Sequence, residues 1–185
     1  MNTACKKLPL GIQTLSQIIA GGYYYVDKTA LALQLIEKGK YYFLSRPRRF
    51  GKSLFLDALK EIFEGNQALF NGLAIHDQWD WSQRFPVIRI NFGAASLRDS
   101  ADLARLLHQQ LEDHERQFNL PARYADQRSR FGDLILRLHQ QTGQSVVVLV
   151  DEYDKPILDK IENRAIAQAI RDDLNDLYSV IKGQD

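Results

Sequence analysis

The sequence predicts an α/β protein with a three-layer fold around a mostly parallel sheet. Short apolar runs typical of strands alternate with longer amphipathic runs typical of helices. The valine-rich run 146–150 has no polar alternation, which indicates a strand buried on both faces and therefore central in a parallel sheet. Residues 86–92 alternate apolar and polar side chains before Gly93, which indicates a strand nearer the edge.

The other elements follow from helical spacing and turn residues. We expect residues 1–28 to be a turn-rich leader and residues 29–185 to form the folded domain. A helix over 29–38 should end at Gly39, and a strand should follow over 41–44. Apolar residues at three- and four-residue spacing predict further helices over 53–63, 97–118, 130–141 and 164–181.

The composition narrows the class of protein. A chain of 185 residues with 45% hydrophobic residues can bury the core of one domain. The 24 Lys and Arg nearly balance 23 Asp and Glu, so charge gives no support for a nucleic-acid partner. One cysteine, Cys5, excludes an internal disulfide framework and fits a reducing compartment. Without an evident signal peptide or an apolar run of membrane-spanning length, we expect a cytoplasmic protein and no membrane partner.

The strongest functional signal is the loop from Ser45 to Ser53, which reads Ser-Arg-Pro-Arg-Arg-Phe-Gly-Lys-Ser. Its place between an expected strand and an expected helix is the layout of a phosphate-binding P-loop. Gly51 would let the backbone approach a phosphate, and N–H groups of the loop and first helical turn would point at the anion. Lys52 would neutralise the β- and γ-phosphates, and the Ser53 hydroxyl would ligate Mg²⁺.

The loop departs from the general pattern G-x-x-x-x-G-K-[ST] because Arg46 stands where the first glycine is expected. Pro47 and three arginines make it stiffer and more cationic than usual. The arginines could contact phosphates, solvent or nucleic acid, and these interpretations stay open. The predicted nucleotide-binding residues are Arg46, Pro47, Arg48, Arg49, Phe50, Gly51, Lys52 and Ser53.

Two carboxylates, Asp151 and Glu152, follow the predicted central strand. In parallel sheets ligands bind beyond the carboxyl ends of the strands, where Lys52 and Ser53 are also expected. Asp151 would hold Mg²⁺, and Glu152 would polarise the attacking water. The alternative is a core strand followed by a solvated acidic turn, and the upstream Gly-Lys-Ser loop favours the site.

Four segments together resemble the AAA-ATPase-like proteins of bacteria and archaea, from about residue 8 onward: 8–12, 22–29, 45–53 and 151–157. The resemblance implies a P-loop ATPase, often followed by a PD-(D/E)XK nuclease-like domain. Family members continue past the last helix with another strand that carries a polar sensor residue. We therefore expect this chain to be a truncated N-terminal part with an incomplete sheet.

The leading hypothesis is an ATP-binding domain that hydrolyses ATP with Mg²⁺ in the intact protein, with Lys52 and Glu152 as catalytic residues and Ser53 and Asp151 as metal ligands. No guanine-recognition motif is visible, which favours ATP. An alternative is a degenerate, non-catalytic module for protein interaction or for regulating a nuclease-like partner. A weaker third hypothesis is a DNA-linked module. Residues 27–29 could flank the nucleotide base or only cap a helix.

Overall fold

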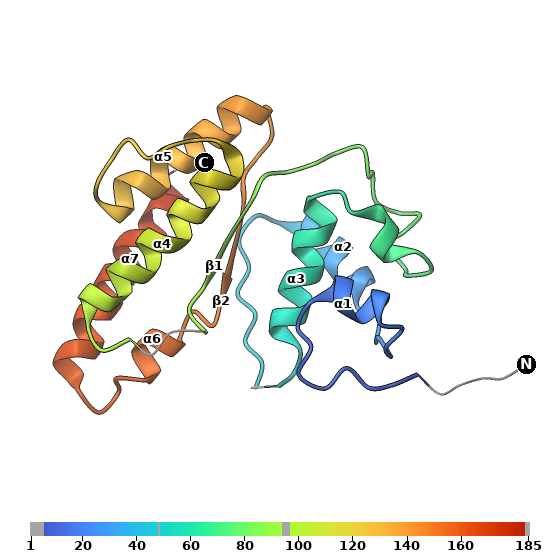
Figure 1. Ribbon diagram of the computed structural model, residues 1–185, viewed down its shortest axis with the longest axis horizontal. Coiled ribbons are helices and arrows are strands. Elements are labelled where there is room, and N and C mark those ends of the chain that lie inside the picture. The colour runs from blue at the N-terminus through green and yellow to red at the C-terminus, as the bar shows by residue number, and fades with distance from the viewer. Residues whose placement is uncertain (1–5, 48, 94–96, 184–185) are drawn as a thin grey trace, which may run out of the picture. The chain divides into compact units, whose positions relative to one another are not determined.

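The computed structural model describes residues 6–47, 49–93 and 97–183 (Figure 1). The chain divides into two compact units, Met1–Phe85 and Pro86–Asp185, and each has its own cluster of buried apolar side chains. Two residues with sequence-based predictions, Cys5 and Arg48, lie outside the described residues.

The first unit is helical. It contains α1 (Leu15–Ala20), α2 (Thr29–Lys38), α3 (Lys52–Phe63) and the 3₁₀-helix η1 (Gln67–Phe70), drawn in blue to green in Figure 1. The predicted helices over 29–38 and 53–63 are confirmed as α2 and α3. The buried apolar side chains that pack into one cluster in this unit are Leu15, Ala32, Ala58, Ile62, Phe70 and Ile75.

The helix α1 falls inside the segment expected to be a turn-rich leader. The side chain of Thr14 does not cap this helix, but the buried Asp57 of α3 accepts the Leu15 N–H at 2.7 Å. This bond satisfies one of the donors that the first turn of a helix leaves open. Leu15 and Ile18 are fully buried, so the leader segment contributes two side chains to packing as well as a helix.

The predicted strand over residues 41–44 is wrong. These residues form no strand, and their side chains are largely exposed, with Tyr41 at 55% and Phe43 at 69%. An apolar run becomes a strand only when a neighbouring strand pairs with its backbone. The described residues of the first unit contain no strand that could supply that pairing.

The second unit contains β1 (Val87–Asn91), α4 (Ser100–Phe118), α5 (Gln127–Thr142), β2 (Val147–Asp151), α6 (Lys155–Leu158) and α7 (Arg164–Lys182). Both predicted strands and all three predicted long helices are confirmed here. β1 and β2 pair in parallel, with Val87 opposite Val147 and Asn91 opposite Asp151. The crossover between them carries α4 and α5, as parallel pairing requires.

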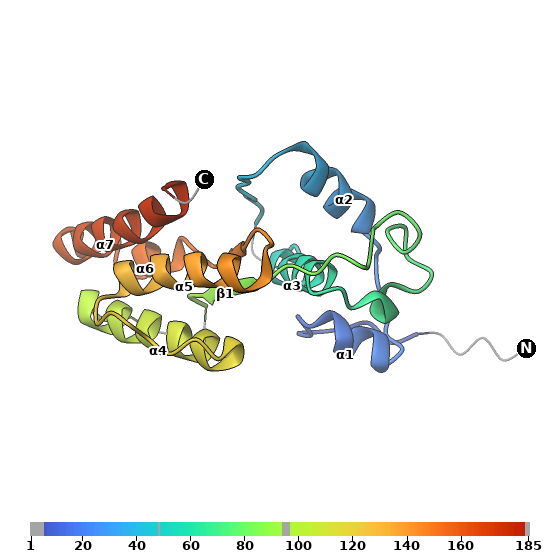
Figure 2. The same ribbon diagram turned by 90° about the horizontal axis from the view of Figure 1, so that it is seen from above.

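The three long helices α4, α5 and α7 lie side by side next to the strands (Figures 1 and 2). Their inward faces share one core with β1, which includes Ile88, Leu107, Phe131, Leu138 and Leu174. The unit is therefore a mixed α/β structure with a small parallel sheet. β2 was expected to be central. Among the described residues it pairs with β1 alone, and Val147, Val148 and Val150 are only half-buried.

Side chains of α4 cover the outer edge of β1. Gln110 accepts the Asn91 N–H through Oε1 at 2.7 Å and donates through Nε2 to the Asn91 carbonyl at 3.1 Å. One turn further along α4, Nε2 of His114 lies 3.1 Å from the Arg89 nitrogen and 2.9 Å from its carbonyl oxygen. Arg89 and Asn91 are two residues apart, so their main-chain groups face the same edge. The edge position predicted for β1 thus has a physical basis: α4 occupies the place of a further strand.

Replacing Gln110 by alanine should destabilise the second unit. It would leave the N–H and carbonyl of Asn91 without the groups that now satisfy them, at a cost of about 1–3 kcal/mol. Urea denaturation followed by circular dichroism measures the change in unfolding free energy. The matched control is Gln109→Ala, because Gln109 is the exposed neighbour on the same helix. Equal stabilities of the two variants would contradict the proposed edge cover.

Candidate functional site

The described part of the loop before α3 contains two residues with left-handed backbones. Arg49 and Gly51 both adopt left-handed conformations, with φ of 66° and 77°. Turns that contain left-handed residues form concavities lined by N–H groups. Gly51 is also the N-cap of α3, and it has no side chain of its own with which to cap that helix. A start of this kind favours an anion there.

Lys52 folds back over the loop that precedes it. Its Nζ donates to the carbonyl oxygens of Arg46 at 2.9 Å and Pro47 at 3.3 Å. These two bonds hold the ends of the loop together and place the ammonium group at its mouth. Arg46, Arg49 and Phe50 are exposed around it, Phe50 at 66%. The loop is therefore closed on itself, cationic and open to solvent.

The acidic pair lies in the second unit, at the carboxyl end of β2. Asp151 is the last residue of that strand, and its side chain is only 3% exposed. Nη2 of Arg89, on the neighbouring strand, lies 3.2 Å from its Oδ2. A buried carboxylate is costly unless it is paired or hydrogen-bonded, and Arg89 supplies part of that compensation.

Glu152 has a conformation that is rare for a residue with a side chain. Its φ of 53° is left-handed, and such strain persists where the surrounding structure enforces it, often at functional sites. A Cβ added to Gly93 would come within 3.2 Å of Glu152 Cγ and 3.0 Å of Asn91 Oδ1, so the three residues are packed closely. Asn91 Oδ1 also accepts the Gly93 N–H at 2.7 Å.

The motifs in the sequence give no role to Arg89 or Asn91, although both lie near Asp151 in the sheet. The missing information is the register. Once Asn91 is opposite Asp151, alternation along the strands puts Arg89, Asn91 and Asp151 on one face. The only signal in the sequence is the pair of polar residues within the apolar run 86–92.

Residues 27–29 could flank a nucleotide base or only cap a helix, and their hydrogen bonds indicate a structural role at the start of α2. Asp27 accepts the N–H groups of Thr29 at 2.8 Å and Ala74 at 2.7 Å, while Thr29 Oγ1 accepts the Ile75 N–H at 3.1 Å. Burial works to raise the pKa of Asp27, but the bonds from Ala74 and Thr29 outweigh it and lower the pKa. These side chains fix the entry to α2 onto the segment around Ile75, although Asp27 is not the N-cap residue itself.

The predicted ligands suit a magnesium–nucleotide complex. A hydroxyl and a carboxylate, from Ser53 and Asp151, are hard oxygen donors. In the described residues no group of three or more His, Cys, Asp and Glu could hold a metal by itself. Mg²⁺ typically needs only one or two protein oxygens when phosphates supply the others. Residues 46–53 belong to the first unit, and Asp151 and Glu152 belong to the second.

The second unit has a mixed α/β fold. The chain belongs to the family described as "Predicted AAA-ATPase", whose sequence model matches residues 9–185. It is 57% identical over 181 residues to an "Uncharacterized protein in vnfD 5'region" of Azotobacter chroococcum mcd 1. That match covers 97% of this chain but 35% of the relative, so the chain spans about a third of the relative's length. No solved structure matches the chain. No helix in the described segments is both long and apolar enough to cross a membrane.

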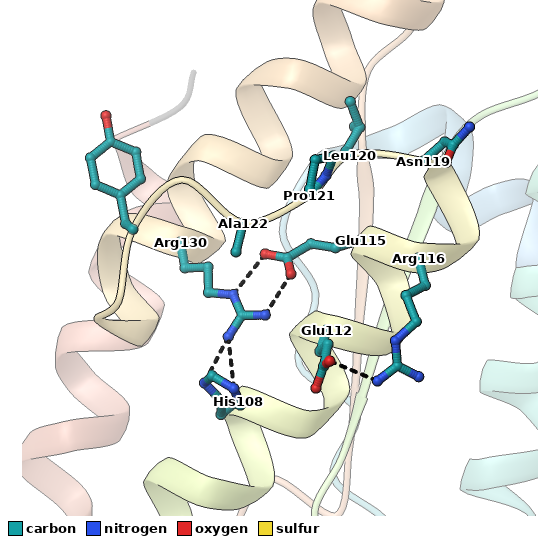
Figure 3. A pocket seen from close by; sticks show the side chains of 10 residues that line it. His108, Glu112, Glu115, Arg116, Asn119, Leu120, Pro121, Ala122 and Arg130 are labelled. Carbon is teal, nitrogen blue, oxygen red and sulfur yellow. Dashed lines mark hydrogen bonds and ion pairs between the residues drawn. The ribbon is translucent and has the colours of Figure 1, made fainter.

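A separate cavity of about 490 Å³ lies beside α4 and the start of α5 (Figure 3). Its charged side chains bind one another. Nε and Nη2 of Arg130 donate to the two Glu115 oxygens at 2.7 and 2.5 Å, and Nη1 lies 2.7 Å from His108 Nδ1. Arg130 and Glu115 are 3% and 5% exposed. Because this pair joins two helices and none of the predicted site residues lines the cavity, we read it as a structural brace.

Truncating Glu115 to alanine should therefore destabilise the second unit by about 3–5 kcal/mol, since it leaves the buried Arg130 charge uncompensated. The double replacement Glu115→Leu with Arg130→Met should be close to neutral, because both charges leave together. Chemical denaturation of the three proteins measures this. Glu112→Ala is the control: Glu112 pairs with Arg116 on the exposed side of the same helix and should cost less than about 1 kcal/mol. A similar loss for Glu112→Ala and Glu115→Ala would refute the brace.

Proposed function

We propose that this chain is the nucleotide-binding part of a longer protein that binds ATP with Mg²⁺ and hydrolyses it. The observation that carries the proposal is the loop at α3. A left-handed Gly51, which has no side chain to act as a cap, precedes α3, and Lys52 Nζ lies against the carbonyls of the loop. Family membership gives the same direction, because the family is one of predicted AAA-ATPases.

In this proposal the phosphates bind at the loop. The N–H groups at the start of α3 receive the β-phosphate, and Lys52 exchanges its carbonyl partners for phosphate oxygens. Arg46, Pro47, Arg48, Arg49 and Phe50 form the remaining wall of the nucleotide site. Arg46 and Arg49, which are exposed, add positive charge that attracts the triphosphate from solution.

The acidic pair supplies the metal site and the base. Ser53 and Asp151 hold Mg²⁺ together with the phosphate oxygens, and Glu152 orients and polarises the attacking water. Phosphoryl transfer depends mainly on positioning and charge stabilisation, so Lys52 contributes by neutralising charge that develops on the γ-phosphate. The strained Glu152 backbone supports this role, because it fixes where the carboxylate leaves the strand.

This function requires a larger sheet than the parallel pair β1–β2. We therefore include in the proposal a three-layer, AAA-like fold, with hydrolysis as a property of the longer protein. The second candidate is a non-catalytic module that interacts with a protein or regulates a nuclease-like partner. Arg46 in place of glycine favours it, as does the stiffer Pro47 in the loop. A cytoplasmic location stays a prediction.

Lys52→Ala should weaken Mg·ATP binding by about 1.5–3 kcal/mol, the contribution of a charge-assisted hydrogen bond to phosphate. Isothermal titration calorimetry of the wild-type chain and the variant measures this. Lys38→Ala is the control. Lys38 is an exposed cation in the last turn of α2, so this variant loses the same single positive charge as Lys52→Ala. Wild-type affinity in Lys52→Ala would exclude the P-loop reading.

Glu152→Gln, made in the longer protein, should retain Mg·ATP binding and lose ATP hydrolysis by about 10²–10⁴-fold, because it keeps the shape and removes the base. Phosphate release measures turnover, and calorimetry confirms that binding is intact. Glu162→Gln serves as the control because Glu162 is an exposed residue in the turn before α7. Hydrolysis at the wild-type rate in Glu152→Gln would remove Glu152 from the mechanism. Absent hydrolysis in the wild-type protein would favour the non-catalytic module.

A further inference from the structure

We propose that Arg89 is a built-in counter-ion that competes with the divalent cation for Asp151, so that the metal binds together with the nucleotide rather than before it. This inference rests on the proposed function, because it assumes that Asp151 is a metal ligand. It concerns a residue of β1 to which neither the motifs nor the family description gives a role.

The geometry carries the first step. Arg89 is opposite Leu149 in the sheet, so its side chain shares a face with Asp151, two residues further along β2. Nη2 of Arg89 reaches Oδ2 of Asp151 at 3.2 Å. Arg89 is 23% exposed and Asp151 only 3%, so solvent screens this pair less than a surface ion pair.

The main chain of Arg89 is also fixed. His114 of α4 contacts its backbone, and Gln110 contacts the backbone of Asn91 two residues later. The guanidinium group therefore starts from a defined position on the edge strand. Its planar form suits a carboxylate partner.

The energetics give the direction of the effect. A divalent cation bound to Asp151 would lie within a few ångströms of the Arg89 charge, and the repulsion between them weakens metal binding. A nucleoside triphosphate brings negative oxygens to the same metal and offsets that repulsion. Arg89 thus keeps the buried carboxylate compensated in the free protein and disfavours the metal without nucleotide. It is a positioning residue and takes no part in bond making.

The experiment measures Mn²⁺ affinity without nucleotide, by electron paramagnetic resonance or calorimetry. Mn²⁺ is the probe because it shares the oxygen preference of Mg²⁺. Arg89→Gln should bind Mn²⁺ about tenfold more tightly than wild type, whereas Arg89→Lys should stay close to wild type because the charge remains. Arg105→Gln is the matched control: Arg105 is an exposed arginine of α4 that pairs with Asp102.

A second measurement tests the inference even if Arg89→Gln is less stable than the wild type. Mn²⁺ should raise its melting temperature more than that of the wild type, since tighter binding to the folded state stabilises it. Adding Asp151→Asn to Arg89→Gln should abolish the tenfold gain. Unchanged or weaker Mn²⁺ affinity in Arg89→Gln, a gain that persists with Asp151→Asn, or a variant that stays unfolded in saturating Mn²⁺ would each overturn the inference.

Failure of the inference is distinguishable from failure of the proposed function. If Lys52→Ala still weakens Mg·ATP binding while Arg89→Gln leaves Mn²⁺ affinity unchanged, only the role of Arg89 is lost. If Lys52→Ala has no effect, the P-loop proposal itself fails, whatever Arg89→Gln does.

Discussion

The hydrogen bonds between α4 and the outer edge of β1 are the constraint on which the second unit depends. A parallel pair of strands exposes main-chain groups on two edges, and each group needs a partner or water. Gln110 and His114, one turn apart, provide partners for Asn91 and Arg89. This fixes the rotation of α4 about its axis, so Leu103, Leu107 and Leu111 turn toward the core. The same bonds hold in place the two strand residues that lie near Asp151.

The sequence predicted the long elements of this structure well because their signals are local. α3 follows from its apolar stripe and the glycine before it, and β1 and β2 follow from their apolar runs. Residues 41–44 show the limit of this reasoning. They have the composition of a strand, yet strand formation depends on a partner that is distant in sequence. The helix α1 was not predicted from the sequence for a related reason: its first N–H is satisfied by Asp57, 42 residues away.

The residues of the candidate site differ in the same way in how far the sequence predicts them. The Gly-Lys-Ser loop and the Asp-Glu pair are contiguous motifs, so their residue types alone suggest their chemistry. The left-handed backbone of Arg49 and Glu152 gives no sign in the sequence, because both are residues that ordinarily avoid positive φ. The contact of Arg89 with Asp151 joins residues 62 positions apart and depends on strand register. Such contacts can be identified only once the fold is known.

In the loop before α3 and at the end of β2, charged side chains have partners within the protein. Lys52 donates to carbonyls of its loop, and Asp151 is paired with Arg89. Each arrangement stabilises the free protein, and each must be given up in part when a phosphate or a metal binds. On the proposed function, a magnesium–nucleotide complex would compensate both losses together, since its phosphates would attract Lys52 while its metal would attract Asp151. Nucleotide without metal leaves Asp151 with Arg89, and metal without nucleotide leaves Lys52 with its carbonyls. On the proposed function, the free-state pairing therefore favours the complete complex over either component alone.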